Sequence, residues 1–159
     1  MNAAGCFTHL DTPLGRLLLT ADPDGALTSL HCARAVPDGL RADPGPFAAA
    51  REQLEAYFAG ELRAFRLPLR AHGTDFRQRV WEALDEVPYG TTLTYGGLAA
   101  RIAAPRAAVR AVGGALGANP LLIVRPCHRV IGSDGSLTGY AGGLDRKIHL
   151  LTLEGALTA

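Results

Sequence analysis

The sequence lacks any long apolar run. No stretch approaches the roughly 18–20 consecutive apolar residues that a membrane-spanning helix needs. Residues 1–12 also lack the basic start and apolar core of a secretory signal. Of the 159 residues, 48% are hydrophobic and 19% are charged, which is a globular composition. We therefore expect a cytoplasmic protein with no membrane partner, built as one ordinary domain or two small ones.

Cysteine is scarce, with only Cys6, Cys32 and Cys127. An odd number of cysteines without paired spacing argues against a disulfide framework. Cys6 and Cys32 are expected to be small, buried apolar side chains. A metal site formed by Cys6, His9, His31 and Cys32 across neighbouring strands is the alternative, but the Cys-x-x-Cys spacing of structural zinc sites is absent, so we expect no metal.

Acidic residues are absent between Glu86 and Asp134. The same stretch contains five arginines, namely Arg101, Arg106, Arg110, Arg125 and Arg129. Such a segment suits a polyanion, for example the phosphate backbone of a nucleic acid. An ordinary solvated face is the alternative.

The first third of the sequence predicts a small sheet followed by a helix. Apolar-rich runs separated by turn signals predict strands at 7–10, 16–20 and 26–31. Helical spacing predicts a helix over 46–59 that ends at Gly60. Residues 62–73 are expected to be a strand or an extended linker. We place the domain boundary there, which gives domains 1–73 and 74–159.

The second part of the sequence predicts mainly helices, so the fold class is α+β. The expected helices span 75–87, 95–103, 107–116 and 145–153, with a short strand at 121–124. Thr74 or Asp75 would cap the first helix and Thr94 the second. The last helix would turn Ile148, Leu150 and Leu151 inward. The two short helices on either side of 104–106 are typical of a helix-turn-helix.

The second helix of this pair carries small residues. It reads Ala-Ala-Val-Arg-Ala-Val-Gly-Gly-Ala-Leu, whereas a typical major-groove recognition helix presents long polar side chains. Gly113 and Gly114 each weaken the helix by about 1 kcal/mol relative to alanine. Small residues with the single Arg110 favour a shape-reading contact in the minor groove and one inserted side chain. Close helix–helix packing is the alternative.

Cys127 is the candidate nucleophile. A thiol reacts as thiolate and needs a base or positive charge nearby, which His128 and Arg129 offer. Because adjacent residues on an extended strand point to opposite sides, either a bridging water or a bend after Pro126 would be needed to connect His128 to the sulfur. Glu154, at the end of the last helix, is the candidate to orient the imidazole.

The sequence around Cys127 resembles a known signature. Residues 119–132 read Asn-Pro-Leu-Leu-Ile-Val-Arg-Pro-Cys-His-Arg-Val-Ile-Gly, which resembles the active site of the O6-alkylguanine-DNA alkyltransferases, also called methylated-DNA–protein-cysteine methyltransferases. Further matches are residues 76–95, 110–113, 139–144, Lys147 and 154–155. The resemblance is close over 75–155 and loose before it.

The resemblance implies a fold and a reaction. The fold would be a ribonuclease H-like N-terminal supporting domain and a DNA-binding, active-site domain with the helix-turn-helix. The protein would be a single-turnover DNA repair enzyme that flips O6-alkylguanine out of double-stranded DNA through the minor groove. The alkyl group would move irreversibly to Cys127. O4-alkylthymine is a second candidate substrate, a monomer is expected, and no cofactor is implied.

The resemblance also implies individual roles. Cys127 would be the nucleophile, His128 its base through water, Glu154 the group holding His128, Asn119 a hinge residue, and Tyr95 a donor to the leaving purine. The DNA-binding residues would be Tyr95, Gly96, Arg110, Ala111, Gly113, Gly114 and Ser133, with Arg110 filling the gap left by the flipped nucleotide. The substrate pocket would be lined by Leu116, Val130, Tyr140 and Ala141.

The sequence departs from the family pattern at three places. One extra residue lies between Tyr95 and Arg110, Arg125 stands where an apolar residue is usual, and Ala141 replaces a serine of some relatives. Three other functions fit parts of the sequence: a non-catalytic lesion sensor, a helix-turn-helix transcription regulator and a thiol hydrolase. Cys127 argues against the first, and the small-residue helix argues against the second.

Overall fold

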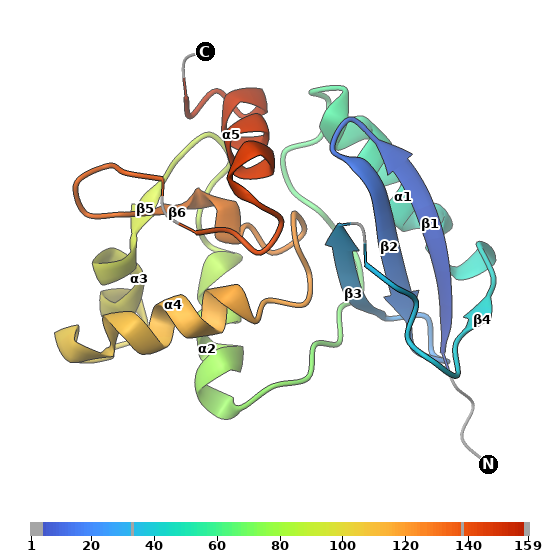
Figure 1. Cartoon of the computed structure of the whole chain (residues 1–159), viewed down its shortest axis with the longest axis horizontal. Coiled ribbons are helices and arrows are strands. Elements are labelled where there is room, and N and C mark those ends of the chain that lie inside the picture. The colour runs from blue at the N-terminus through green and yellow to red at the C-terminus, as the bar shows by residue number, and fades with distance from the viewer. Residues whose placement is uncertain (1–4, 33, 138, 158–159) are drawn as a thin grey trace. The chain divides into compact units, whose positions relative to one another are not determined.

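The computed structural model describes residues 5–32, 34–137 and 139–157. The chain divides into two compact units, residues 1–72 and 73–159 (Figure 1). The first unit is a sheet with one α-helix and the second is mainly helical, which confirms the predicted α+β class. Among the described residues, no helix has the length and apolar character needed to cross a membrane.

The sheet of the first unit has four strands in the order β3-β2-β1-β4. Strands β1 (Cys6–Thr12), β2 (Gly15–Ala21) and β3 (Leu27–Cys32) form an antiparallel meander, and the short β4 (Arg41–Ala42) pairs in parallel with β1. Residues 17–21 of β2 are all buried, so both faces of this strand are covered. This explains why its sequence is a continuous apolar run rather than an alternating one.

One helix follows the sheet. A 3-10 turn, η1 (Gly45–Phe47), leads into α1 (Ala48–Phe58), and Leu54 and Tyr57 on α1 are buried. Gly60 follows the helix with a φ of 79°, a left-handed conformation that favours glycine. The predicted helix and its end are confirmed.

The segment after α1 is extended rather than a full strand. Leu69 makes one isolated bridge to Leu27, where Leu27 N–H donates to the Pro68 carbonyl and Arg70 N–H donates to the Leu27 carbonyl. The Arg70 guanidinium also contacts the Asp22 carboxylate at 2.5 Å. These contacts attach the start of the linker to the first unit.

Short elements build the second unit. They are α2 (Asp75–Leu84), β5 (Leu93–Thr94), α3 (Tyr95–Arg101), η2 (Arg106–Ala108), α4 (Val109–Gly117), η3 (Cys127–Arg129), β6 (Val130–Ile131) and α5 (Leu144–Leu153). Strands β5 and β6 pair in parallel, with Leu93 opposite Val130 and Thr94 opposite Ile131. Because β5 runs directly into α3 and β6 follows η3, this pairing brings Tyr95 and Cys127 into one region. Figure 1 shows β5 beside β6.

Helix α2 supports the helix-turn-helix. The Thr74 hydroxyl caps α2 by accepting from Arg77 N–H at 3.2 Å, as expected of an N-cap threonine. Trp81 is fully buried, and its indole N–H donates to the Ala115 carbonyl of α4 at 2.8 Å. A Cβ at position 73 would lie 2.5 Å from the Trp81 ring, so Gly73 is required where the chain passes over this indole.

The predicted strand at 121–124 is wrong, because these residues form a tight turn. The Asn119 side chain accepts from Leu121 N–H at 3.0 Å and donates to the Arg125 carbonyl at 3.1 Å. Arg125 N–H also donates to the Leu121 carbonyl, and Ile123 has a φ of 71°. A β-branched residue is strained in that conformation, so the Asn119 bonds and side-chain burial hold a turn that apolar composition alone does not reveal.

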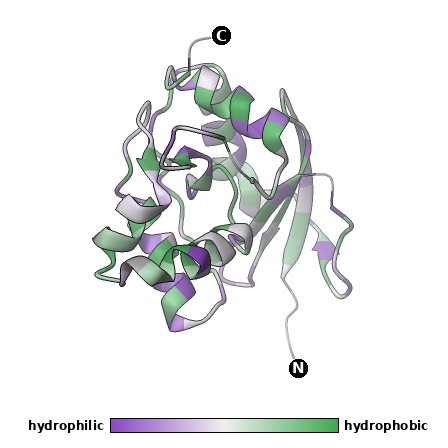
Figure 2. Cartoon of the chain, turned by 60° about the vertical axis from the view of Figure 1, so that its left-hand side comes forward, coloured by the Kyte–Doolittle hydropathy of each residue, from purple (hydrophilic) through white to green (hydrophobic). Residues whose placement is uncertain are grey.

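Two helix details also differ from expectation. Ile148 is 44% exposed, whereas Leu150 and Leu151 are buried as predicted. Figure 2 shows hydrophobic and hydrophilic positions mixed along α5.

The first three predicted helices of this unit are each shorter than expected at one end. Helix α3, for example, ends at Arg101, and Ala103 just after it has a φ of 55°. Left-handed backbone at that residue cannot continue a right-handed helix.

We predict that Trp81→Phe lowers the free energy of unfolding by about 1–3 kcal/mol, because the buried Ala115 carbonyl loses its donor and the smaller ring leaves space. Urea denaturation followed by circular dichroism measures this change. Glu82→Gln, at an exposed position on the same helix, is the control. An unchanged stability of the Trp81 variant would contradict the proposed role of this bond.

Candidate active site

Cys127 begins η3 and is 5% exposed. The chain here is a 3-10 turn, which agrees with the alternative of a bend after Pro126, and Cys127 N–H donates to the Arg125 carbonyl at 2.8 Å. Pro126 precedes the turn and cannot donate a hydrogen bond, which suits a break between the preceding turn and η3. The 3-10 turn therefore presents the thiol from a compact backbone segment rather than from one face of a strand.

The Cys127 side chain borders a cavity of about 290 Å³. The cavity is lined by Tyr95, Gly113, Leu116, Gly117, Cys127, Gly139, Tyr140 and Ala141. Of the predicted pocket residues, Leu116, Tyr140 and Ala141 lie in this lining, but Val130 does not. Val130 is completely buried in β6.

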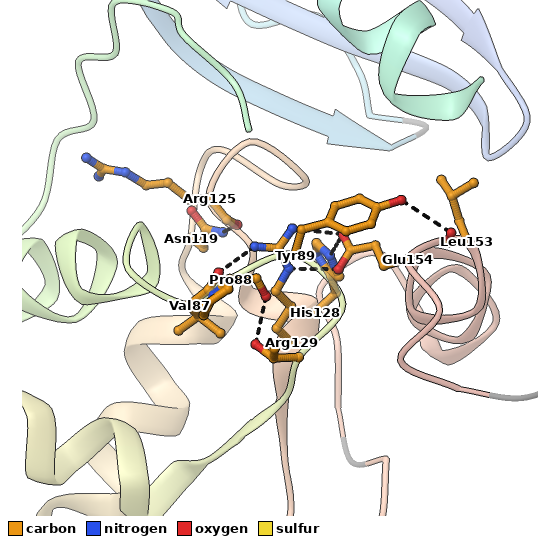
Figure 3. Close-up of polar contacts among 10 residues, drawn as sticks. Val87, Pro88, Tyr89, Asn119, Arg125, His128, Arg129, Leu153 and Glu154 are labelled. Carbon is orange, nitrogen blue, oxygen red and sulfur yellow. Dashed lines mark hydrogen bonds and ion pairs between the residues drawn. The ribbon is translucent and has the colours of Figure 1, made fainter. Parts of the chain in front are cut away.

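His128 and Glu154 meet, as the sequence suggested. The imidazole Nε2 lies 2.8 Å from Glu154 Oε2, and both side chains are completely buried (Figure 3). Because a carboxylate only accepts hydrogen bonds, Nε2 carries the proton and Nδ1 keeps a lone pair. Nδ1 makes no hydrogen bond to any described residue. The contact therefore prepares His128 to accept a proton at Nδ1.

Arg129 makes more contacts in this site than the sequence indicated, where it was only a positive charge near Cys127. Its Nε and Nη2 donate to the two oxygens of Glu154 at 2.8 and 3.0 Å, and its Nη1 donates to the Val87 carbonyl at 2.6 Å. The guanidinium also lies 5.7 Å from the centre of the Tyr89 ring, whose hydroxyl donates to the Leu153 carbonyl (Figure 3). Arg129 thus neutralises Glu154 and connects the α2–β5 loop to the end of α5.

Burial decides the protonation of Cys127 and His128. It raises the pKa of the Cys127 thiol to about 11, although an Asn119 hydrogen bond and the Lys147 charge act in the opposite direction. Burial also lowers the pKa of His128 below its ordinary 6.5, opposed by the hydrogen bond and charge of Glu154. At neutral pH the resting pair is therefore a neutral thiol and a neutral imidazole, so attack requires proton removal.

A second hollow of about 770 Å³ lies along the helix-turn-helix. It is lined by Thr94, Tyr95, Gly96, Gly97, Ala99, Ala100, Ala104, Val109 and Ser133. Tyr95 borders both this hollow and the cavity at Cys127. The two spaces are therefore adjacent at this tyrosine. Most of the other residues that line the larger hollow have small side chains.

The glycines of α4 do not serve helix–helix packing. A Cβ added at Gly113 or Gly114 would meet no described atom within 4 Å, which excludes the alternative of close packing inside the unit. Arg110, Ala111 and Gly114 are exposed on the same helix. The small residues therefore form an accessible surface with one long cationic side chain.

Arg125, the residue that stands where an apolar one is usual, pairs with an acidic residue at the end of α2. Its side chain is 11% exposed, and its Nε lies 3.7 Å from Asp85 Oδ1. Figure 3 shows it extending away from the cluster of His128, Arg129 and Glu154. Its charge is directed to the Asp85 carboxylate, whose pKa it helps to lower against the raising effect of burial.

The alternative metal site receives no support from the described residues. They contain no group of three or more His, Cys, Asp or Glu side chains placed to hold a metal ion. His31 instead faces Arg34 at 3.1 Å, and burial lowers its pKa to about 4.

Two family models match the two units of the chain. The 6-O-methylguanine DNA methyltransferase ribonuclease-like domain matches residues 6–71. The 6-O-methylguanine DNA methyltransferase DNA binding domain matches residues 75–156.

Proteins similar in sequence and in structure agree with these matches. The methylated-DNA–protein-cysteine methyltransferase of Mycobacterium tuberculosis H37Rv is 52% identical over 152 residues, covering 93% of this chain and 91% of the relative. That of Methanosarcina acetivorans is 48% identical over 155 residues, covering 94% and 98%. The crystal structure of M. tuberculosis OGT in complex with DNA has a TM-score of 0.89 and 50% identity, covering 94% of this chain and 92% of that chain. The chain therefore belongs to the 6-O-methylguanine DNA methyltransferase family.

Proposed function

We propose that this protein repairs DNA by moving the alkyl group from O6 of guanine to Sγ of Cys127. The observation that carries the proposal is the cavity at Cys127, with the His128–Glu154 pair beside it. The match to a DNA binding domain and the DNA complex of a relative support DNA as the partner. We also propose a cytoplasmic monomer, in keeping with the composition.

The chemistry begins with the thiol proton. His128 Nδ1, with its lone pair free of described partners, would take the Cys127 proton through a water molecule, while Glu154 stabilises the imidazolium that forms. The sulfur electron pair then forms a bond to the alkyl carbon as the C–O6 bond breaks, and the bonding pair leaves with guanine. Tyr95, which borders the cavity, would donate a proton to the purine as negative charge develops.

The alkyl carbon in a stacked guanine is out of reach of a buried sulfur. The target nucleotide must therefore rotate out of the duplex, which costs a few kcal/mol. We propose that Arg110 enters the vacated space, that the small residues of α4 allow close approach in the minor groove, and that Gly96 and Ser133 complete the DNA contact. Arg110 is exposed and the neighbouring glycines are open, which supports this assignment.

The product should be permanent. A thioether is stable in water, and the proposed chemistry offers no step that regenerates the thiol. Each molecule would then act once, without a cofactor. Ala141 in the cavity lining, in place of a serine, offers no hydroxyl near the substrate. O4-alkylthymine is a second candidate substrate.

Incubation with duplex DNA containing O6-methylguanine should add one methyl group to each protein, on the peptide that contains Cys127. Intact-mass and peptide mass spectrometry measure this addition. Cys127→Ala should abolish transfer and retain lesion binding, and Cys32→Ala is the matched cysteine control. Continued turnover would indicate a thiol hydrolase, and lesion binding without an adduct would indicate a sensor; either result contradicts the proposal.

Removal of the base should slow the reaction most near neutral pH. We expect His128→Phe to lower the transfer rate at pH 7 by about 10²–10⁴-fold, because the thiol no longer has a proton acceptor. Since the pKa of His128 is lowered, wild-type activity should persist below pH 6.5 and decline only when the imidazole protonates. Single-turnover rates across pH measure both effects. His149→Phe, an exposed histidine of α5, is the control, and an equal loss in it would contradict the role of His128.

Arg110→Ala should slow transfer from duplex DNA much more than transfer from free O6-benzylguanine, because only the duplex requires extrusion of the nucleotide. Rates on the two substrates give the ratio directly. Arg101→Ala, an exposed arginine at the end of α3, controls for the general loss of positive charge. Equal losses on both substrates would remove Arg110 from the extrusion step.

A further inference from the structure

Lys147 is a buried cation to which the mechanism above gives no task. It lies on α5 and is 1% exposed, although lysine is seldom fully buried without a specific partner. Its Nζ donates to the Val130 carbonyl at 2.7 Å and to the Gly139 carbonyl at 3.2 Å. These bonds satisfy donors of the ammonium but bring no formal negative charge to it.

The two carbonyls belong to different sides of the site. Val130 follows η3 directly, so its carbonyl is fixed to the segment that carries Cys127. Gly139 lines the cavity, next to Tyr140 and Ala141. Lys147 therefore joins the segment that carries Cys127 to another residue of the cavity lining through a single buried group.

The charged groups around Lys147 indicate that its ammonium interacts with the thiolate form of Cys127. The carboxylate of Glu154 is already bound by Arg129 and His128. The influence between Lys147 and Cys127 is mutual: the ammonium lowers the pKa of the thiol, and the thiolate raises the pKa of Lys147 against the lowering effect of burial. Burial is the main cause of the lowered pKa of His128, and the charge of Lys147 acts in the same direction.

We propose that Lys147 is a positioning residue of the alkyl transfer: its buried ammonium stabilises the Cys127 thiolate at the moment of attack, and its bond to Gly139 holds the cavity wall in place. This inference rests on the proposed function. Lys147 keeps its own protons throughout. The thiol proton goes to His128, the Sγ–carbon bond forms and the C–O6 bond breaks.

Lys147→Gln separates charge from hydrogen bonding, because the glutamine amide retains two N–H donors for the carbonyls. We expect its single-turnover rate at saturating O6-methylguanine duplex to fall about tenfold or more at pH 7, since one unit in the thiol pKa changes the thiolate fraction tenfold. The deficit should narrow as the pH rises toward the thiol pKa. At saturating DNA concentration, a change in the affinity for DNA does not affect the measured rate. Arg146→Gln, which removes a neighbouring charge from the same helix, should leave the maximal rate within about twofold.

The outcomes separate this inference from the function on which it rests. Absence of a methyl adduct in the wild-type protein would overturn the function itself. A normal wild-type rate with an equal rate and pH profile in Lys147→Gln would overturn only the role of Lys147. A rate deficit that stays constant up to the pH at which the thiol ionises would also count against it, because a purely structural defect has no reason to follow thiol ionisation.

A measurement on the wild-type protein covers the case in which the variant does not fold. Lys147 is the sole lysine of the sequence, so ¹⁵N-lysine labelling gives one Nζ signal. We expect the ammonium to lose its proton at lower pH after Cys127 has been methylated, because a thioether cannot become a counter-charge. Identical titration before and after methylation would overturn the proposed coupling.

Discussion

The buried carboxylate of Glu154 is the point on which the second unit depends. His128 and Arg129 both bind it, so one side chain at the end of α5 fixes the tautomer of the base and the position of the turn that carries Cys127. A buried ion pair of this kind gives little net stability, but removal of one partner leaves an uncompensated charge at a cost of about 3–5 kcal/mol. The main effect of this ion pair is therefore geometric: it fixes the end of α5, the η3 turn and, through Arg129, the α2–β5 loop relative to one another.

In the proposed mechanism, this arrangement keeps the Cys127 thiol unreactive until it is needed. Because burial holds the Cys127 thiol protonated, oxidants and incidental electrophiles meet the unreactive form. The same burial makes the thiolate a strong nucleophile when it forms, since few waters stabilise it. For a protein that acts once, loss of the thiol to a side reaction is as final as repair, so a protected resting state favours the intended substrate.

Local patterns in the sequence predicted much of the fold and the central site. The Thr74 cap, the β1–β3 meander and the contact of His128 with Glu154 followed from residue spacing or from the family signature. The turn at 121–124 did not, because the side-chain bonds of Asn119 override an apolar run that reads as a strand.

The remaining errors concern long-range contacts. Exposure of Ile148, burial of Arg125 near Asp85 and the absence of Val130 from the cavity lining depend on which elements pack together. Arg129 and Lys147 were visible as charges, but their partners Val87 and Gly139 offer only backbone carbonyls, which no residue pattern marks.

Burial of the sole lysine has a consequence for how the protein can be followed in solution. Acylating reagents attack the uncharged amine and need access to it, so Lys147 should be inert while α5 remains docked on β6. Acylation of Lys147 would then occur only in molecules in which α5 has separated from β6. The chain thus contains a natural chemical probe for local opening of the unit that holds the thiol, and no label needs to be introduced.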